Sequence, residues 1–261
     1  MCSSDLEGAY YNGIGDLEDG GTSNYNAMLL TVQRRRAKGL TIQGNYTFAK
    51  CIGETVVSQP GSGGNTPGFR KYNRGFCGGD RSHSANLSTV VETPKFANNT
   101  VRMLASGWQL SGILKLSTGT AFTVNSGVDT TFTGTGDNGR ANQVLEDVYV
   151  SDKNKDHWLN RNAFAVPTQA TGLCSPITKS CGYGNAALSY RGPGSINFDM
   201  GLTRRFQLTE SQSLEFRAEA FNMPNHVNPG NPTNSLNSQT FGKSTTAADP
   251  RIMQLALKYV F

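Results

Sequence analysis

The final stretch of the chain, RIMQLALKYVF (251–261), alternates between two kinds of side chain. Every second position, counted back from the end, is apolar or aromatic: Met253, Leu255, Leu257, Tyr259 and Phe261. Successive side chains of a β-strand point to opposite faces, so this spacing predicts a strand with one apolar face. Soluble domains usually end in a polar, mobile tail. A membrane-spanning barrel accounts for this ending better, because its last strand must pair to close the ring.

The same period of two recurs along the chain and predicts six further strands. The clearest is LTIQGNYTFAK (40–50), in which Leu40 and Ile42 face one way and Thr41 and Gln43 the other. The predicted strands cover residues 25–35, 40–50, 83–92, 107–118, 194–206, 213–221 and 251–261. Their apolar rows are expected to form one continuous exposed band: Leu40, Ile42, Tyr46, Phe48, Trp108, Leu110, Leu114, Leu116, Phe198, Met200, Leu214, Phe216, Leu255, Leu257 and Tyr259.

The second face of each strand carries polar side chains, including ionic ones in mid-strand, which a wet interior tolerates. Five of these residues are predicted to line that interior: Asn45, Lys115, Asp199, Arg217 and Lys258. Aromatic residues lie near strand ends more often than in strand middles, as they do in the aromatic girdles of membrane barrels. The two faces together favour a barrel with an apolar exterior and a polar lumen.

The connections between the predicted strands alternate in length. The shorter ones cover residues 36–39, 93–103 and 207–212, and the long ones 51–82, 119–193 and 222–250. Outer-membrane barrels have short periplasmic turns and long extracellular loops. We therefore predict an all-β, antiparallel up-and-down meander of about seven strands, part of an incomplete transmembrane β-barrel. A secreted soluble β-sandwich is the alternative, and the alternation of loop lengths disfavours it.

Composition and motifs give no support for an enzyme, a cofactor or a metal site. The chain has 261 residues and a formal net charge of +5, without the basic stripe that a nucleic-acid surface needs. DKNKDHWLNRNA (152–163) imitates a calcium loop, but His157 and Ala163 stand where Gly and Glu are expected. GTGDNG (134–139) is interpreted as a turn cluster. In NHVNPGNP (225–232) a structural turn is favoured over a ligand role for Asn225 or His226.

The five cysteines leave the disulfide pattern open. Cys2 falls within Met1–Leu6, a segment (MCSSDL) that we interpret as translated sequencing adaptor, with the barrel domain covering residues 7–261. The other four allow three pairings. Joining Cys174 with Cys181 and Cys51 with Cys77 gives the shortest loops, and we predict that arrangement for an oxidising compartment.

Several stretches resemble a known family. The ending 251–261 resembles the carboxy-terminal signature of outer-membrane barrels, which implies recognition by the barrel-assembly machinery. NYNAMLLTVQRRRAKGLTIQGNYTFAK (24–50), GWQLSGILKLSTGTAFTV (107–124), HWLNRNAFAVP (157–167), RGPGSINFDMGLTRRFQL (191–208) and LEFRAEAFNMPNHVNPGNP (214–232) resemble the Oar-like branch of TonB-dependent receptors.

The resemblance implies a fold, a location and partners. It implies an upstream carboxypeptidase-regulatory-like domain, a plug and a barrel of about twenty-two strands, in contact with outer-membrane lipid and with the TonB system through parts upstream of this chain. The implied function is capture or import of a large nutrient, an oligosaccharide or peptide, on loops 51–82, 119–193 and 222–250. The alternative from another class is a surface adhesion or structural protein without transport.

Overall fold

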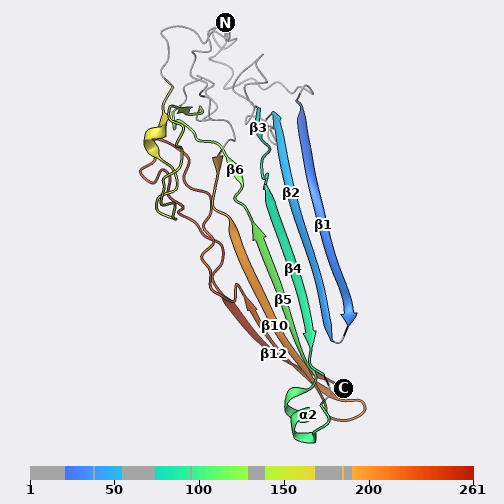
Figure 1. Cartoon of the computed structure of the whole chain (residues 1–261). Coiled ribbons are helices and arrows are strands. Elements are labelled where there is room, and N and C mark those ends of the chain that lie inside the picture. Colours follow the sequence, from blue (N-terminus) through green and yellow to red (C-terminus); the bar gives the residue numbers. More distant parts are fainter. Residues whose placement is uncertain are drawn as a thin grey trace, which may run out of the picture.

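A single antiparallel sheet dominates the computed structural model, which describes residues 21–37, 39–54, 74–94, 96–128, 139–167, 184 and 190–261. Its seven long strands pair in sequence order: β1 (Ser23–Ala37), β2 (Leu40–Glu54), β4 (His83–Glu92), β5 (Trp108–Ser117), β10 (Ser195–Gln207), β11 (Ser213–Phe221) and β12 (Ile252–Val260). A short strand, β3 (Arg74–Phe76), pairs with the far end of β2. In the described chain β1 and β12 do not pair with each other, so the sheet is open (Figure 1). The predicted all-β meander is confirmed.

The first two strands are longer than the sequence pattern predicts. Their register runs from Ser23 opposite Gly53 to Ala37 opposite Leu40. The prediction ended the second strand at Lys50, where a glycine-containing stretch interrupts the alternation. Pairing continues beyond this point because β2 has a partner on each side there, β1 on one and β3 on the other.

The strand connections separate into two groups at opposite ends of the sheet (Figure 1). The shorter ones lie at the end where the carboxy terminus also lies, as predicted. One of them contains a helix that the sequence analysis did not foresee, α2 (Asn99–Ala105). The Asn98 side chain caps it by accepting from the backbone N–H groups of Thr100 and Val101. Arg204 of β10 donates to the carbonyls of Met103 and Leu104, so this short helix is attached to the sheet.

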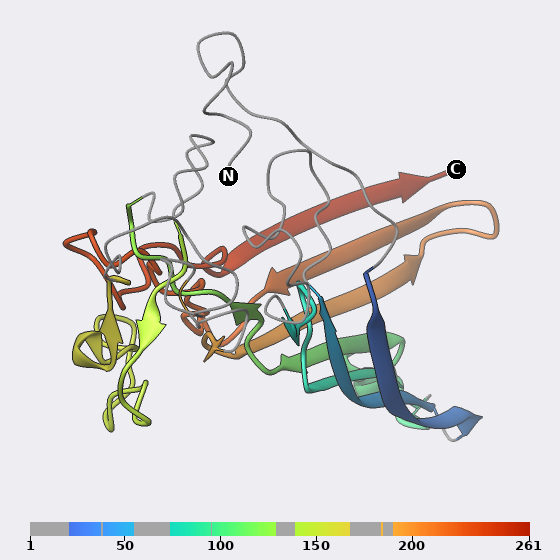
Figure 2. The same ribbon diagram turned by 90° about the horizontal axis from the view of Figure 1, so that it is seen from above.

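One face of the sheet is apolar from edge to edge, and we call it the apolar face. The register places Leu30, Tyr46, Ala85, Leu116 and Ile196 in one row across five strands. The rows beside it are built in the same way, and many of their side chains are exposed: Met28, Val32, Phe48, Leu87, Val91, Leu110, Met253, Leu255, Leu257 and Tyr259. The predicted apolar band therefore lies on a single face. Figure 2 shows that the sheet curves as an arc from β1 to β12.

The opposite side of the sheet is the polar face. Asn45 lies opposite Asn86, which lies opposite Lys115, and Lys115 lies opposite Asn197. Asn197 donates to Asp199 at 2.8 Å. Charges of opposite sign stand together further along, where Arg217 lies 2.9 Å from Glu215 and 3.9 Å from Glu219. The same register puts all five predicted interior residues on this face: Asn45, Lys115, Asp199, Arg217 and Lys258.

The main cluster of buried hydrophobic side chains in the described chain lies in the loops, and the long strands add only Ala49 and Ala220. It is built from the described parts of the β5–β10 and β11–β12 connections, which we call the loop cap. Its members are Phe122, Val124, Ala141, Val148, Leu159, Ala163, Phe164, Tyr190, Leu236 and Phe241. The sequence pattern predicts these segments only as long loops. Among the helices of the described chain, none has the length and apolar character needed to cross a membrane.

Candidate functional site

Short elements shape the loop cap around its core. β6 (Ala121–Phe122) pairs with β9 (Tyr190–Arg191), and β7 (Asn142–Gln143) pairs with β8 (Phe164–Ala165). The 3-10 helix η2 (Arg161–Ala163) precedes β8 and is capped by the Asn160 side chain. Phe164 packs edge-on against Tyr190 at 5.1 Å and against Phe241 at 5.9 Å between ring centroids. These aromatic contacts make the cap a packed unit and not an irregular loop.

The two long connections that form the cap are joined to each other by main-chain hydrogen bonds. Asn125 N–H donates to the Asn234 carbonyl at 2.8 Å, and Leu236 N–H donates back to the Asn125 carbonyl at 2.9 Å. Further along, Trp158 N–H donates to the Gly242 carbonyl at 2.9 Å. Because strand-like pairing links segments from two loops, the cap presents one fixed surface.

A buried ion pair attaches the cap to the connection between β2 and β4. The Arg191 guanidinium pairs with the Asp80 carboxylate, which is 1% exposed. Arg191 also donates to the carbonyls of Asp80 and Gly119 at 3.0 and 3.2 Å. The other carboxylate oxygen of Asp80 accepts from Cys51 N–H at 2.8 Å. Cys51 is joined to Cys77 by a disulfide, with Cα atoms 5.3 Å apart. The backbone that holds Asp80 is therefore also fixed by a covalent bond.

The turn that follows β11 is held by asparagine side chains. Asn222 and Asn225 both adopt positive φ angles, +48° and +55°, which asparagine tolerates better than most residues. The Asn222 amide donates to the carbonyls of His226 and Asp249. Asn228 exchanges two hydrogen bonds with the backbone of Ile196. The favoured interpretation of this stretch as a structural turn agrees with these contacts.

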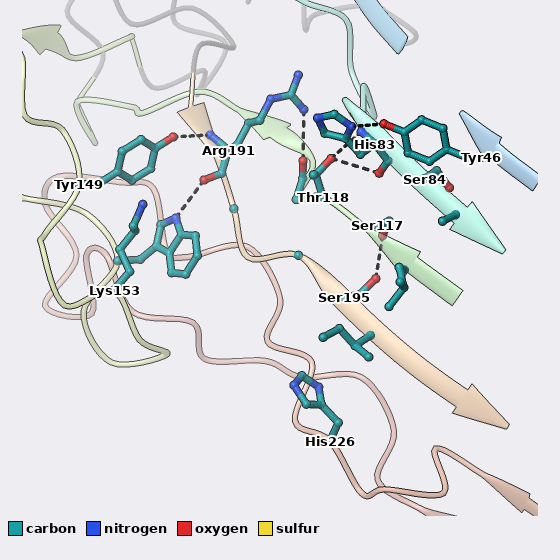
Figure 3. Close-up of a pocket in the computed structure, with 17 residues that line it drawn as sticks. Tyr46, His83, Ser84, Ser117, Thr118, Tyr149, Lys153, Arg191, Ser195 and His226 are labelled. Carbon is teal, nitrogen blue, oxygen red and sulfur yellow. Dashed lines mark hydrogen bonds between the residues drawn. The ribbon is translucent and has the colours of Figure 1, made fainter. Parts of the chain in front are cut away.

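A cleft of about 860 Å³ opens between the cap and the apolar face. The floor comes from strands and includes Tyr46, Ala85, Leu116 and Ile196, all of which belong to the row described above. The overhanging wall comes from the cap and includes Tyr149, Lys153 and Trp158. Figure 3 shows Lys153 and Tyr149 on one side of the cleft, with His83 and Tyr46 on the other.

The overhanging wall is a tight hairpin whose base is aromatic. Tyr149 and Trp158 stand edge to face at 6.5 Å, and each is fixed to the backbone of Arg191. Lys153 Nζ lies 4.8 Å from the Tyr149 ring centroid and 5.8 Å from that of Trp158. The Asn154 side chain closes the turn by accepting from two backbone N–H groups of residues 156 and 157. The calcium-like stretch is thus a self-bonded turn, and the described chain holds no cluster of three metal-ligating side chains.

Two titratable groups of the cap have displaced pKa values. Burial raises the pKa of Tyr190 to about 12, and its hydroxyl donates to Gln143 Oε1 at 2.9 Å. The hydrogen bond from Lys155 lowers the pKa of Asp156 on the exposed tip of the hairpin.

The predicted site residues fall in different parts of the structure. The terminal residues Met253, Leu255, Leu257 and Tyr259 lie on the apolar face, and Phe261 is 89% exposed and stacks on Tyr259 at 5.9 Å. The pair Cys174 and Cys181 lies outside the described residues. The sequence alone did not reveal the cleft. The stretch HWLNRNAFAVP (157–167), which was noted only for its family resemblance, nevertheless supplies part of the cleft wall and of the cap core.

Comparison with protein families identifies a match over most of the chain. The family model described as "Outer membrane beta barrel domain" matches residues 3–254, nearly the whole chain. Neither a curated protein nor a solved structure matches the chain significantly. The matched family agrees with a sheet that has one apolar face, one polar face and its long connections at one end.

Proposed function

The chain belongs to the outer membrane beta barrel domain family and lies in the bacterial outer membrane, and on that premise we propose that it is the carboxy-terminal part of an Oar-like, TonB-dependent receptor. In this proposal the loop cap is extracellular, the apolar face contacts lipid and the polar face lines the lumen. The receptor captures a large polar nutrient on its loops and imports it with energy from the TonB system.

The observation that carries the proposal is the folded loop cap. Binding residues are most effective on loops that a rigid scaffold holds in place. Here two long connections share one core, exchange main-chain hydrogen bonds and are anchored to a third connection through Asp80 and Arg191. A preformed extracellular surface loses little conformational freedom when a ligand binds, which suits a receptor.

The polar face supports a polar ligand without strong net charge. Its side chains include amides and hydroxyls that both donate and accept hydrogen bonds, such as Asn45, Asn86 and Asn197. Cations and anions are interspersed on it, as in the group of Arg217, Glu215 and Glu219. Oligosaccharides and peptides have this mixed hydrogen-bonding character, so we propose one of these as the nutrient.

Surface adhesion without transport is the second candidate. The loop cap favours it to some extent, because a folded unit with its own core can hold a partner outside the cell while nothing passes through the barrel. The two functions share a binding surface, and they differ in whether binding is followed by TonB-dependent uptake.

Uptake and binding should be measured separately on the full-length protein in its own bacterium. Fluorescent oligosaccharides and peptides are screened for binding to whole cells, and accumulation in the periplasm is followed with and without a functional TonB complex. The receptor proposal expects surface binding in both strains and accumulation only in the first. Binding with no accumulation in either strain would establish the adhesion alternative in its place.

A matched pair of variants tests the part played by the cap. Phe164→Ala removes a core side chain of the cap, whereas Val166→Ala changes an exposed neighbour two residues away. We expect the first to weaken ligand binding and the second to leave it unchanged. Equal binding by both variants, in folded barrels, would show that the cap does not carry the ligand site.

A further inference from the structure

The cleft beneath the cap lies on the lipid side of the sheet. Its largest strand-derived lining side chains, Tyr46, Leu116 and Ile196, belong to the apolar face. Ser84, Ser117 and Ser195, which alternate with apolar-face residues at the strand ends, also line it. The apolar face then continues along β5 through Leu114 and Leu110, with Gly112 between them covered by Phe198. A molecule seated in this cleft therefore touches the same surface that contacts the membrane.

The position along the strand places the cleft at the outer boundary of the membrane. From Leu116 to Trp108, the first residue of β5, the strand covers about 26 Å at roughly 3.3 Å per residue. With a strand tilt of about 40°, this corresponds to about 20 Å of membrane thickness, close to the ~25 Å apolar band of such barrels. Trp108 lies at the other boundary, with the Arg204 guanidinium 5.1 Å from its ring centroid. The cleft is thus at headgroup level.

The rim of the cleft offers a cation and polar aromatic groups at that level. Lys153 is exposed, and within the described residues no carboxylate lies at ion-pair distance from its amine. The rings of Tyr149 and Trp158 hold its side chain over the cleft. Across the cleft, the Tyr46 hydroxyl and His83 Nδ1 are 2.8 Å apart, and His226 lies below them (Figure 3).

We propose that this cleft binds a phosphorylated glycolipid of the outer leaflet, with a phosphate beside Lys153 and an acyl chain on Leu116 and Ile196. Charge complementarity accounts for the phosphate, and continuity with the lipid-facing surface accounts for the acyl chain. The sugar hydroxyls meet the hydrogen-bonding groups of Tyr46 and His83. A soluble anion would use the cation alone and would gain nothing from the apolar floor.

Binding to purified, delipidated full-length protein in a mild detergent tests the proposal. The probe is diphosphorylated lipid A, and bound lipid is counted by native mass spectrometry. The variant is Lys153→Gln, and the matched control is Lys155→Gln on the same hairpin, whose amine instead pairs with Asp156 at 2.7 Å. Removing one charge-assisted hydrogen bond should weaken binding about 10-fold for Lys153→Gln. Lys155→Gln should bind as the wild type does, and Lys153→Arg should retain binding.

Three comparison ligands separate this site from general attraction. Dephosphorylated lipid A and a diphosphorylated glucosamine disaccharide without acyl chains should each bind at least about 10-fold more weakly than the probe. Phosphatidylglycerol should not displace the probe at equal concentration. Equal binding of any of these three, or equal loss in the two Gln variants, would overturn the proposal. The readout does not involve nutrient import, so it stands apart from the receptor function.

Discussion

Arg191 and Asp80 form an ion pair that joins two connections 111 residues apart in the sequence. The Asp80 side chain is 1% exposed and the Arg191 side chain 21% exposed. The Arg191 guanidinium also lies 4.4 Å from the Phe76 ring centroid. This contact is the point at which the loop cap is attached to the rim of the sheet.

Removing the carboxylate should loosen the cap without unfolding the barrel. Asp80→Ala leaves the Arg191 guanidinium without its ionic partner and Cys51 N–H without its acceptor. Breaking a buried pair in this way costs about 3–5 kcal/mol. Hydrogen exchange of the amides in β6 and β9 should accelerate, and exchange in β5 and β10 should not.

A pair on the polar face provides the control for this experiment. Glu215→Ala removes the nearer of the two carboxylate partners of Arg217, whose side chain is 50% exposed. Exposed pairs contribute at most about 1 kcal/mol. If Asp80→Ala changed the exchange of the cap no more than Glu215→Ala does, the anchoring role of the ion pair would be wrong.

The packing of the cap should depend on its buried aromatic side chain. Phe164→Ala should destabilise the cap by about 3–5 kcal/mol, because Phe164 is only 7% exposed and contacts two other rings. Val166→Ala should cost less than about 1 kcal/mol, because that side chain is 44% exposed. Limited proteolysis of the folded protein in detergent should cleave the cap of the first variant and spare that of the second. Similar cleavage of both would argue against a cooperative cap core.

The strands of the sheet were predictable because each repeats one physical rule. A strand with lipid on one side and water on the other must alternate apolar and polar side chains at every position. The residue type at Leu110, Leu114 and Lys115 therefore shows which face each side chain occupies. The second strand exceeds its predicted end at Lys50, where a third segment, β3, supplies an additional partner. The periodicity of a strand's own sequence cannot predict that a separate short strand will pair with its end.

The loop cap was not predictable in the same way, because its core side chains have no common period. Phe122, Leu159 and Phe241 come from segments far apart in the chain and meet only when both connections fold together. Helix α2 was missed for a different reason. It is seven residues long, and its cap at Asn98 and its attachment through Arg204 hold it in place. The cleft forms where the cap overhangs the sheet, so neither the strand pattern nor the loop sequence alone predicts it.

The stability of the cap should fall at alkaline pH through Tyr190. An exposed tyrosine ionises near pH 10, and burial raises the pKa of Tyr190 to about 12. The stabilising effect of the neutral phenol is therefore complete below pH 10 and is lost as the pH rises from 10 to about 12, because the unfolded cap ionises first. A shift of this size corresponds to about 3 kcal/mol at most.

Absorbance of tyrosinate isolates this group when the wild type is compared with Tyr190→Phe. The variant loses the hydrogen bond to Gln143 and about 1 kcal/mol of stability, but the stability of its cap should change less over this pH range. Trp158 fluorescence reports cap opening, since its indole N–H donates to the Arg191 carbonyl at 2.9 Å. A Tyr190 titration near pH 10 in the folded protein would refute the prediction.

The two faces of β5 give the sharpest test of the membrane arrangement, because adjacent residues should respond in opposite ways. Leu114 lies on the apolar face, between Leu87 and Phe198, and Lys115 lies on the polar face, between Asn86 and Asn197. Leu114 lies two residues from Leu116, about 5 Å inside the outer boundary at roughly 3.3 Å per residue and a tilt of about 40°. Leu114→Arg should therefore cost about 1–2 kcal/mol, between the values expected at the interface and at the midplane, because the guanidinium enters hydrocarbon. Lys115→Ala should be nearly neutral, because the Lys115 side chain is exposed and Asn197 keeps its hydrogen bond to Asp199. Urea unfolding of the full-length barrel in lipid vesicles measures both. Equal shifts of the unfolding midpoint in the two variants would show that the faces do not differ as proposed. A larger shift for Lys115→Ala would mean that the faces are assigned the wrong way round.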